Sequence, residues 1–323
     1  MRSPILYFSF FVGFMCFFMA HEARAQKTFT FPSQDGLTIT GDLYQPDSAG
    51  QPKTVVVMFH QAGSSRGEYK HIGPVLADLG YMAMAVDLRA GELHAGVQNK
   101  TADLAEKKLM PTGIFNAVPD MIASIAYAHQ ELRADRIILW GSSFSASFAF
   151  LIAGQTSLEV EQGAPQVIDG VIAFSPAEHF NFNPPVFQVA KSINVPVFIS
   201  SARHEQKDWN TIFNMIRSQH KINFIPNGMG AHGSMAFSSR AKDEYWTALK
   251  SFLSDHFSFE ASPSIFDQIL SDETSLQKSV KHGPTLLDES ANQETQYWSS
   301  DDNLDQDIED EDLPISDRWL VGQ

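Results

Sequence analysis

Apolar and polar positions follow two different periods along residues 26–258. The opening stretch, KTFTFPSQDGLTITGDLYQP, alternates apolar and polar residues on both sides of Asp35-Gly36, which is typical of a β-hairpin. Later runs are almost continuously apolar and predict strands buried on both faces. They span residues 53–60, 81–88, 136–140, 167–175, 195–201 and 221–226. Helical spacing of apolar residues predicts helices near residues 68–79, 117–132, 143–153, 209–219 and 239–257.

This order of strand and helix predicts an α/β fold with a mostly parallel sheet and helices on both faces. The N-terminal hairpin supplies antiparallel strands at one edge. Residues 89–112 lack a clear period, and we expect an irregular segment there. In such sheets ligands bind at the carboxyl ends of the strands, so the loops at those ends are where chemistry is expected.

The N-terminus has the pattern of a secretory signal peptide. Arg2 is followed by an apolar run over residues 5–20 and by Ala23-Arg24-Ala25, so we expect cleavage after residue 25 and export to the periplasm or the medium. The alternative is a membrane anchor, but 16 apolar residues are fewer than the roughly 20 that span a bilayer. Because no later segment is long and apolar enough to span, the mature chain is expected to carry no membrane span. The only cysteine, Cys16, lies in the segment removed, which excludes a cysteine nucleophile or a cysteine metal site.

Charge is concentrated at the other end. Residues 259–323 hold 16 Asp and Glu against three Lys and Arg, whereas residues 26–258 hold 21 against 18. A block of like charge with few apolar residues cannot bury enough surface to fold by itself, so we expect a largely disordered tail. The remaining 26–258 segment is long enough for one domain with one large core. The absence of a basic stripe argues against nucleic acid as a partner.

A candidate nucleophile lies between the strand at 136–140 and the helix that follows it. In Gly141-Ser142-Ser143-Phe144-Ser145, small residues stand two places before and two places after Ser143. A nucleophile on a strained strand-to-helix turn needs small residues at those two places. The pattern departs from G-x-S-x-G because Ser145 stands where glycine is usual. The alternative is that Ser143 is a helix N-cap.

A serine nucleophile needs a base, and His232 is the best placed histidine. It lies in the loop NGMGAHGSMAF after the last predicted strand. An acid that orients the histidine follows the nucleophile and precedes the histidine in this chain order. Glu205 meets that requirement at the end of the strand at 195–201, with Asp208 as the alternative.

The remaining groups are backbone donors and loop side chains. Two N–H groups are needed for an oxyanion hole, and we expect those of Phe144 and Ala62, with Gln61 as the alternative to Ala62. The chain has no H-E-x-x-H pattern, and we expect no metal and no cofactor. Loop side chains either line a pocket or pack in their loops. These are Gln61, His94, Glu178, His179, Phe180 and Phe182.

Over nearly all of residues 27–258 the chain resembles the α/β-hydrolase superfamily, in the style of dienelactone-hydrolase-like members that lack a cap domain. The segments that carry the resemblance are FHQAGSSRGEY, GSSFSAS, FSPAEHF, VFISSARHE and GAHGS. The resemblance implies Ser143 as nucleophile, Glu205 as acid, His232 as base, and backbone donors at Ala62 and Phe144. Departures from the family pattern are Ser145 for glycine, glutamate for the usual aspartate, and Gln61 for the common glycine.

These expectations combine into an exported serine hydrolase that acts on a small-molecule carboxylic ester. A peptidase or amidase with the same three residues is one alternative. A binding protein that keeps the fold without the reaction is another.

Overall fold

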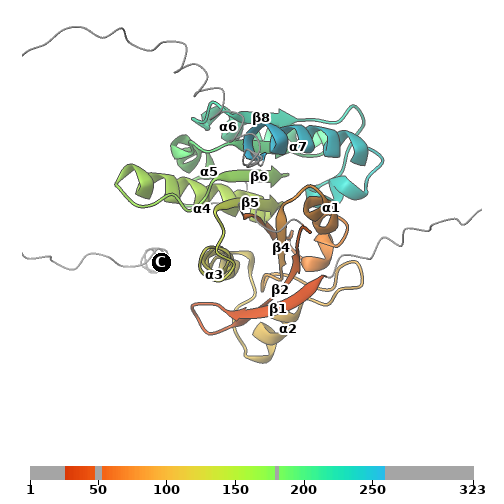
Figure 1. Ribbon diagram of the computed structural model, residues 1–323, viewed down its shortest axis with the longest axis vertical. Coiled ribbons are helices and arrows are strands. Elements are labelled where there is room, and N and C mark those ends of the chain that lie inside the picture. The colour runs from red at the N-terminus through yellow and green to blue at the C-terminus, as the bar shows by residue number, and fades with distance from the viewer. Residues whose placement is uncertain (1–25, 48–52, 179–181, 259–323) are drawn as a thin grey trace, which may run out of the picture.

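The computed structural model describes residues 26–47, 53–178 and 182–258 (Figure 1). The expected signal peptide (1–25) and the expected acidic tail (259–323) lie outside the described residues. None of the helices within the described ranges is long and apolar enough to cross a membrane.

Eight strands form one mixed sheet. They are β1 (Lys27–Pro32), β2 (Thr38–Tyr44), β3 (Thr54–Phe59), β4 (Met82–Val86), β5 (Arg136–Ser142), β6 (Gly170–Phe174), β7 (Val197–Ser200) and β8 (Lys221–Phe224). Their spatial order is β1-β2-β4-β3-β5-β6-β7-β8. The pairs β1–β2 and β2–β4 are antiparallel and all others are parallel. Figure 1 shows the hairpin β1–β2 at one edge of the sheet and β8 at the opposite edge. The predicted fold class and hairpin are therefore confirmed.

Helices cover both faces of the sheet. The α-helices are α1 (Gly73–Asp78), α2 (Lys100–Lys107), α3 (Val118–Gln130), α4 (Phe144–Glu161), α5 (Val186–Val189), α6 (Gln206–Met215) and α7 (Lys242–Phe257). Short 3-10 helices are η1 (Arg66–Tyr69), η2 (Ile114–Ala117), η3 (Ala190–Ser192), η4 (Arg203–Glu205) and η5 (Gly233–Ser238). Successive strand residues point to opposite faces of the sheet. Val55 and Val57 of β3 pack on one face, in a cluster with residues of α3, α4 and α6. Val56 and Met58 pack on the other face, in a cluster with residues of α1 and α7. Both faces are apolar, which explains why the central strands read as continuous apolar runs.

Two expectations about helices are wrong. The helix expected at 68–79 is split into η1 and α1, because α1 begins at Gly73-Pro74 and proline fits only the first turn of a helix. The segment expected to be irregular contains α2. Asn99 caps this helix by accepting a hydrogen bond from the Ala102 N–H at 2.8 Å, a local signal that the apolar pattern did not reveal.

Strand β3 lies where the direction of chain winding reverses. The chain passes from β3 to β4 on one side and later returns to β5 on the other side of β3. The loops after β3 and β5 therefore diverge from adjacent strand ends, and this is the place where an open α/β sheet holds its ligand.

Candidate active site

The turn between β5 and α4 holds Ser143 in a strained conformation. Its backbone has φ 60° and ψ −120°, a combination that non-glycine residues rarely adopt. Ser143 stands at the N-cap of α4, but its side chain makes no capping hydrogen bond. Its side chain is only partly buried. The turn therefore presents a hydroxyl that helix capping does not use.

Gly141 and Ser145 show why this turn needs small residues. A Cβ added at Gly141 would lie 2.3 Å from the Cα of Ala146, so only glycine fits there. Ser145 has room for its side chain. Its hydroxyl links the strand-to-helix turn at residues 141–145, called the elbow below, to the neighbouring strand. Its Oγ accepts from the Ser142 N–H (2.8 Å) and contacts the carbonyl oxygens of Phe59 (2.7 Å) and Ser142 (2.9 Å). Serine in place of the usual glycine at residue 145 thus adds hydrogen bonds that link the ends of β3 and β5.

The structure brings His232 and Glu205 together. The Nδ1 atom of His232 lies 2.6 Å from Oε1 of Glu205. Asp208 lies in the first turn of α6, and the hydrogen bond of His232 is to Glu205. Since Nδ1 is engaged with the carboxylate, Nε2 is the ring nitrogen available to a serine hydroxyl.

The loop that carries His232 is attached to the elbow. The Ser234 N–H donates to Ser142 Oγ at 2.9 Å. Gly233 has φ 57°, and a Cβ there would lie 2.4 Å from the same oxygen. Ser143 is the chain neighbour of Ser142, and His232 lies two residues before Ser234. The arrangement places the histidine loop directly beside the strained serine.

Hydrogen bonding shifts the pKa values of this pair in opposite directions. Burial alone would raise the pKa of Glu205, but hydrogen bonds from His232 and Ser175 and the charge of His232 hold it below its ordinary value. The hydrogen bond to Glu205 raises the pKa of His232 above its ordinary value, against burial, and the charges of Glu205 and Glu68 add to the rise. Half of the His232 side chain is exposed, so solvent screens part of this effect. The pair favours the protonated imidazole that forms when the ring accepts a proton.

The loop after β3 is held from two sides. The Leu88 N–H donates to Nε2 of His60 at 2.9 Å, so the proton of this buried ring is on Nδ1, which donates to the Gln61 carbonyl at 2.7 Å. Burial lowers the pKa of His60, which keeps the ring neutral and this tautomer in place. On the other side, the Gln61 N–H donates to Oε2 of the buried Glu68 at 3.0 Å.

These two contacts decide which backbone donor is free. The Gln61 N–H is engaged with Glu68, so it is not available to an oxyanion. The Gln61 carbonyl and the Ala62 N–H belong to one trans peptide and point in opposite directions. Because His60 holds the carbonyl, the Ala62 N–H points away from His60. The N–H of Phe144 is at the first position of α4, where a helix supplies no internal acceptor.

The residues expected to line a pocket have different locations. Gln61 lies beside the histidine loop, since a Cβ at Gly233 would be 2.7 Å from its Oε1. His94 makes backbone hydrogen bonds with Val97 and lies near His60. The carboxylate of Glu178 accepts from the backbone N–H groups of Val186 and Phe187 at the start of α5. His179 and Phe180 lie outside the described residues. Phe182 is buried and packs its ring on those of Phe115 and Phe148.

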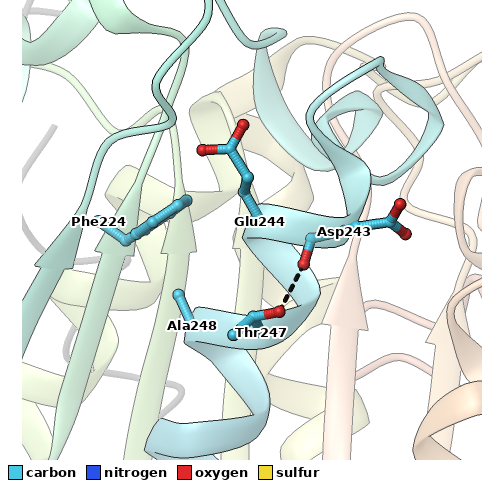
Figure 2. Close-up of a pocket in the computed structure, with 5 residues that line it drawn as sticks. All are labelled: Phe224, Asp243, Glu244, Thr247 and Ala248. Atoms are coloured by element: carbon cyan, nitrogen blue, oxygen red, sulfur yellow. Dashed lines mark hydrogen bonds between the residues drawn. The ribbon is translucent and has the colours of Figure 1, made fainter.

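A surface depression of about 410 Å³ lies away from this chemistry. Figure 2 shows its lining, Phe224 of β8 with Asp243, Glu244, Thr247 and Ala248 of α7, where the Thr247 hydroxyl donates to the Asp243 carbonyl at 2.8 Å. It includes none of Ser143, Glu205 or His232. No cluster of three or more potential metal ligands occurs among the described side chains.

Sequence reasoning missed three residues around the site. Ser175, at the end of β6, donates to Glu205, while His60 and Glu68 hold the loop after β3. The contact of Ser175 with Glu205 joins residues that are distant in sequence. The contacts of His60 and Glu68 with Gln61 are local, but they depend on the direction of each side chain. A polar residue directly after an apolar strand was the only signal in the sequence for Ser175 and His60, and Glu68, which lies in η1, had no such signal.

Comparison with known proteins places the chain in a family. The model of the dienelactone hydrolase family matches residues 39–225. A search of curated proteins found no match.

Solved structures show the same fold at low identity. A dienelactone hydrolase from Anabaena variabilis is 12% identical, with a TM-score of 0.54, over 72% of this chain and 98% of that chain. An esterase from Pyrococcus furiosus is 17% identical, with a TM-score of 0.53, over 73% and 92%. An acylaminoacyl peptidase from Pyrococcus horikoshii is 17% identical, with a TM-score of 0.50, over 76% of this chain and 44% of that chain.

Proposed function

Because this chain belongs to the dienelactone hydrolase family, whose members are hydrolases of the α/β-hydrolase fold, we propose that it cleaves carboxylic esters through an acyl-enzyme on Ser143. Two similar structures, a dienelactone hydrolase and an esterase, favour an ester over an amide as substrate. The proposed catalytic residues are Ser143, His232 and Glu205.

In the first step, Ser143 Oγ attacks the acyl carbon and Nε2 of His232 takes its proton. A serine hydroxyl is a weak nucleophile near neutral pH until a base removes its proton. Glu205 holds Nδ1 at 2.6 Å, which fixes the tautomer in which Nε2 is the free acceptor. The same contact stabilises the imidazolium ion that results.

The tetrahedral intermediate carries a negative oxygen. In our proposal the N–H groups of Ala62 and Phe144 bind that oxygen. The Ala62 N–H lies in the loop after β3 and the Phe144 N–H at the first position of α4, next to the point where strand winding reverses. The His60 contact fixes the Ala62 peptide before substrate arrives, and the helix fixes that of Phe144. Preorganised donors of this kind account for a large part of the rate in acyl transfer.

Collapse of the intermediate releases the alcohol, which takes the proton from His232. Water then attacks the acyl carbon, and His232 serves again as base. The carboxylic acid leaves and Ser143 regains its proton. No metal or cofactor takes part in these steps.

One observation carries this proposal above the rest. His232, which contacts Glu205, lies two residues before Ser234, whose N–H donates to Ser142 Oγ in the elbow. An acid and a histidine paired elsewhere on the surface would have no nucleophile to serve. Here the strained residue adjacent to that contact is a serine with an uncapped hydroxyl.

The test is turnover of p-nitrophenyl esters of increasing acyl-chain length, beside the matching p-nitroanilides. We expect ester hydrolysis, and a loss of about a thousandfold or more in kcat for Ser143→Ala. Ser157→Ala is the matched control, since Ser157 lies on the same helix and its hydroxyl bonds only to Ala153 of that helix, at 2.8 Å. Faster turnover of the anilides would make the protein an amidase or peptidase. Turnover that survives Ser143→Ala would refute the assignment of the nucleophile.

We also propose that the protein is exported after cleavage behind Ala25. The support is the sequence of residues 1–25, with an early Arg, an apolar run and an A-x-A site. N-terminal sequencing of the protein recovered from the producing cells tests this. A first residue of Gln26 is the expected result, and an intact Met1 in the cell interior would contradict it.

A further inference from the structure

Ser175 occupies the end of β6 in an unusual backbone conformation. Its φ is 56°, in the left-handed region that favours glycine, and it precedes Pro176. Its N–H still donates to the Ser200 carbonyl at 2.7 Å, so the residue is held to the end of β7. The residue is buried, with 5% of its surface exposed. A strained residue that is buried between two strand ends is held there by its surroundings.

The side chain of Ser175 makes hydrogen bonds with Glu205 and with the residue that follows His232. Its Oγ donates to Oε2 of Glu205 at 2.6 Å. The same oxygen accepts from the N–H of Gly233, the residue after His232, at 2.8 Å. One hydroxyl thus bonds the carboxylate on one side and the histidine loop on the other.

The carboxylate of Glu205 is consequently fixed at both oxygens. Oε2 receives the Ser175 hydroxyl and the Ala202 N–H at 3.1 Å, and Oε1 faces His232 at 2.6 Å. Glutamate has one more side-chain bond than the aspartate usual in this family pattern, so it has one more rotation to restrict. Contacts at Oε2 restrict that rotation and leave Oε1 in line with the ring.

We propose that Ser175 is a positioning residue for the catalytic pair, holding Glu205 Oε2 so that Oε1 faces His232 and tying the His232 loop to the same point. This inference rests on the proposed function and extends it to a residue outside the triad. Ser175 touches no reacting atom, and it acts only through Glu205 and the loop of His232.

The backbone conformation supplies a sharp test, because glycine adopts φ 56° more readily than serine does. Ser175→Gly removes the hydroxyl and relieves the strain, so the melting temperature should stay the same or rise. Ser175→Ala removes the same hydroxyl but keeps the strain, so it should melt lower. If the hydroxyl positions Glu205, both variants lose about tenfold to a hundredfold in kcat, the size expected for a hydrogen bond to a charged group. KM should change little, because Ser175 does not contact substrate.

Ser147→Ala is the matched control. Its buried hydroxyl also makes two hydrogen bonds to the loop after β6, with the N–H of Ala177 at 3.0 Å and the carbonyl of Ala177 at 2.9 Å. It does not contact Glu205 or His232. We expect Ser147→Ala to lower the melting temperature and leave kcat near the wild-type value.

A double-mutant cycle with Glu205→Gln shows whether Ser175 acts through Glu205. The rate of fluorophosphonate labelling is the readout, and Ser175→Gly should cost much less in the Glu205→Gln background than in the wild type. Equal costs in the two backgrounds would overturn the inference. So would a Ser175→Gly variant that is labelled and turns over as fast as the wild type. A folded wild type that is not labelled at all would overturn the proposed function, and this inference with it.

Discussion

Gly141→Ala tests whether the elbow depends on close backbone contact. An added Cβ would lie 2.3 Å from the Ala146 Cα and 2.5 Å from both the Ala146 N and the Ser145 carbonyl oxygen. All three are backbone atoms, so no side-chain rotation can relieve the overlap. Ordinary contact begins at 3.4 Å, and the start of α4 must therefore move by about 1 Å relative to β5.

That displacement sets the expected magnitude. Overpacking of this kind costs about 1–3 kcal/mol in free energy of unfolding, and occasionally more. A catalytic group displaced by about 1 Å costs on the order of a hundredfold in rate. Since Ser143 and Phe144 lie between Gly141 and Ala146, both the nucleophile and one oxyanion donor would move. We expect kcat to fall about a hundredfold or more in protein that is still folded.

The assay is ester turnover beside thermal unfolding, with Gly36→Ala as control. Gly36 has φ 79° in the hairpin turn, and a Cβ there meets nothing within 4 Å. This control should lose about 1–2 kcal/mol from the left-handed backbone and keep its kcat. Full activity in folded Gly141→Ala protein would refute the reasoning, because it would show that the elbow tolerates the movement.

Further outcomes follow from the contacts around the site. Glu205→Gln replaces the charged hydrogen-bond partner that raises the pKa of His232, so the acid limb of kcat/KM should move to lower pH and kcat should fall by about 10²–10⁴. The pKa of Glu205 is lowered from 4.5 and that of His232 is raised from 6.5. The contribution of the pair to stability is measured as the difference in unfolding free energy between the wild type and Glu205→Gln. It should be fully present between the ordinary pKa values of the two groups, from pH 4.5 to pH 6.5. It should be lost as pH rises through the folded pKa of His232, and lost as pH falls through that of Glu205. His60→Ala should cost about 2–4 kcal/mol in urea unfolding and lower kcat by about a hundredfold, because it frees the peptide that aims the Ala62 N–H. A chain ending at Ser258 should keep its kcat/KM, because all proposed site residues precede that point; a large loss would assign the acidic tail a part in catalysis.

The pattern of apolar residues was sufficient to predict most of the fold. Strands such as β3 and β6 are apolar on both faces because helices cover both, and that alone produces continuous runs in the sequence. Helix α2 was missed because its start depends on one capping contact at Asn99, and because the residues that it buries are the small Thr101, Ala102 and Ala105. The split at Pro74 could have been predicted from the proline itself.

The candidate site was predicted only in part, for a geometric reason. Ser143, Glu205 and His232 each follow a strand, and the carboxyl ends of parallel strands meet at one edge, so their order along the chain was informative. Ser175 was missed because its role depends on a positive φ and on where one hydroxyl points. The direction of the Glu178 carboxylate, which turns back to the start of α5, could not be predicted for the same reason. Side-chain direction within a loop has no periodic signature in a sequence.

Fluorophosphonate labelling of the mature protein tests the central claim most directly. The reagent reacts with an activated serine, and peptide mapping identifies which one. We predict a single labelled residue, Ser143, with labelling lost in Ser143→Ala and strongly slowed in His232→Ala. A folded wild type that is not labelled, or a label on another serine, would contradict the account and make a binding role for this fold the better explanation.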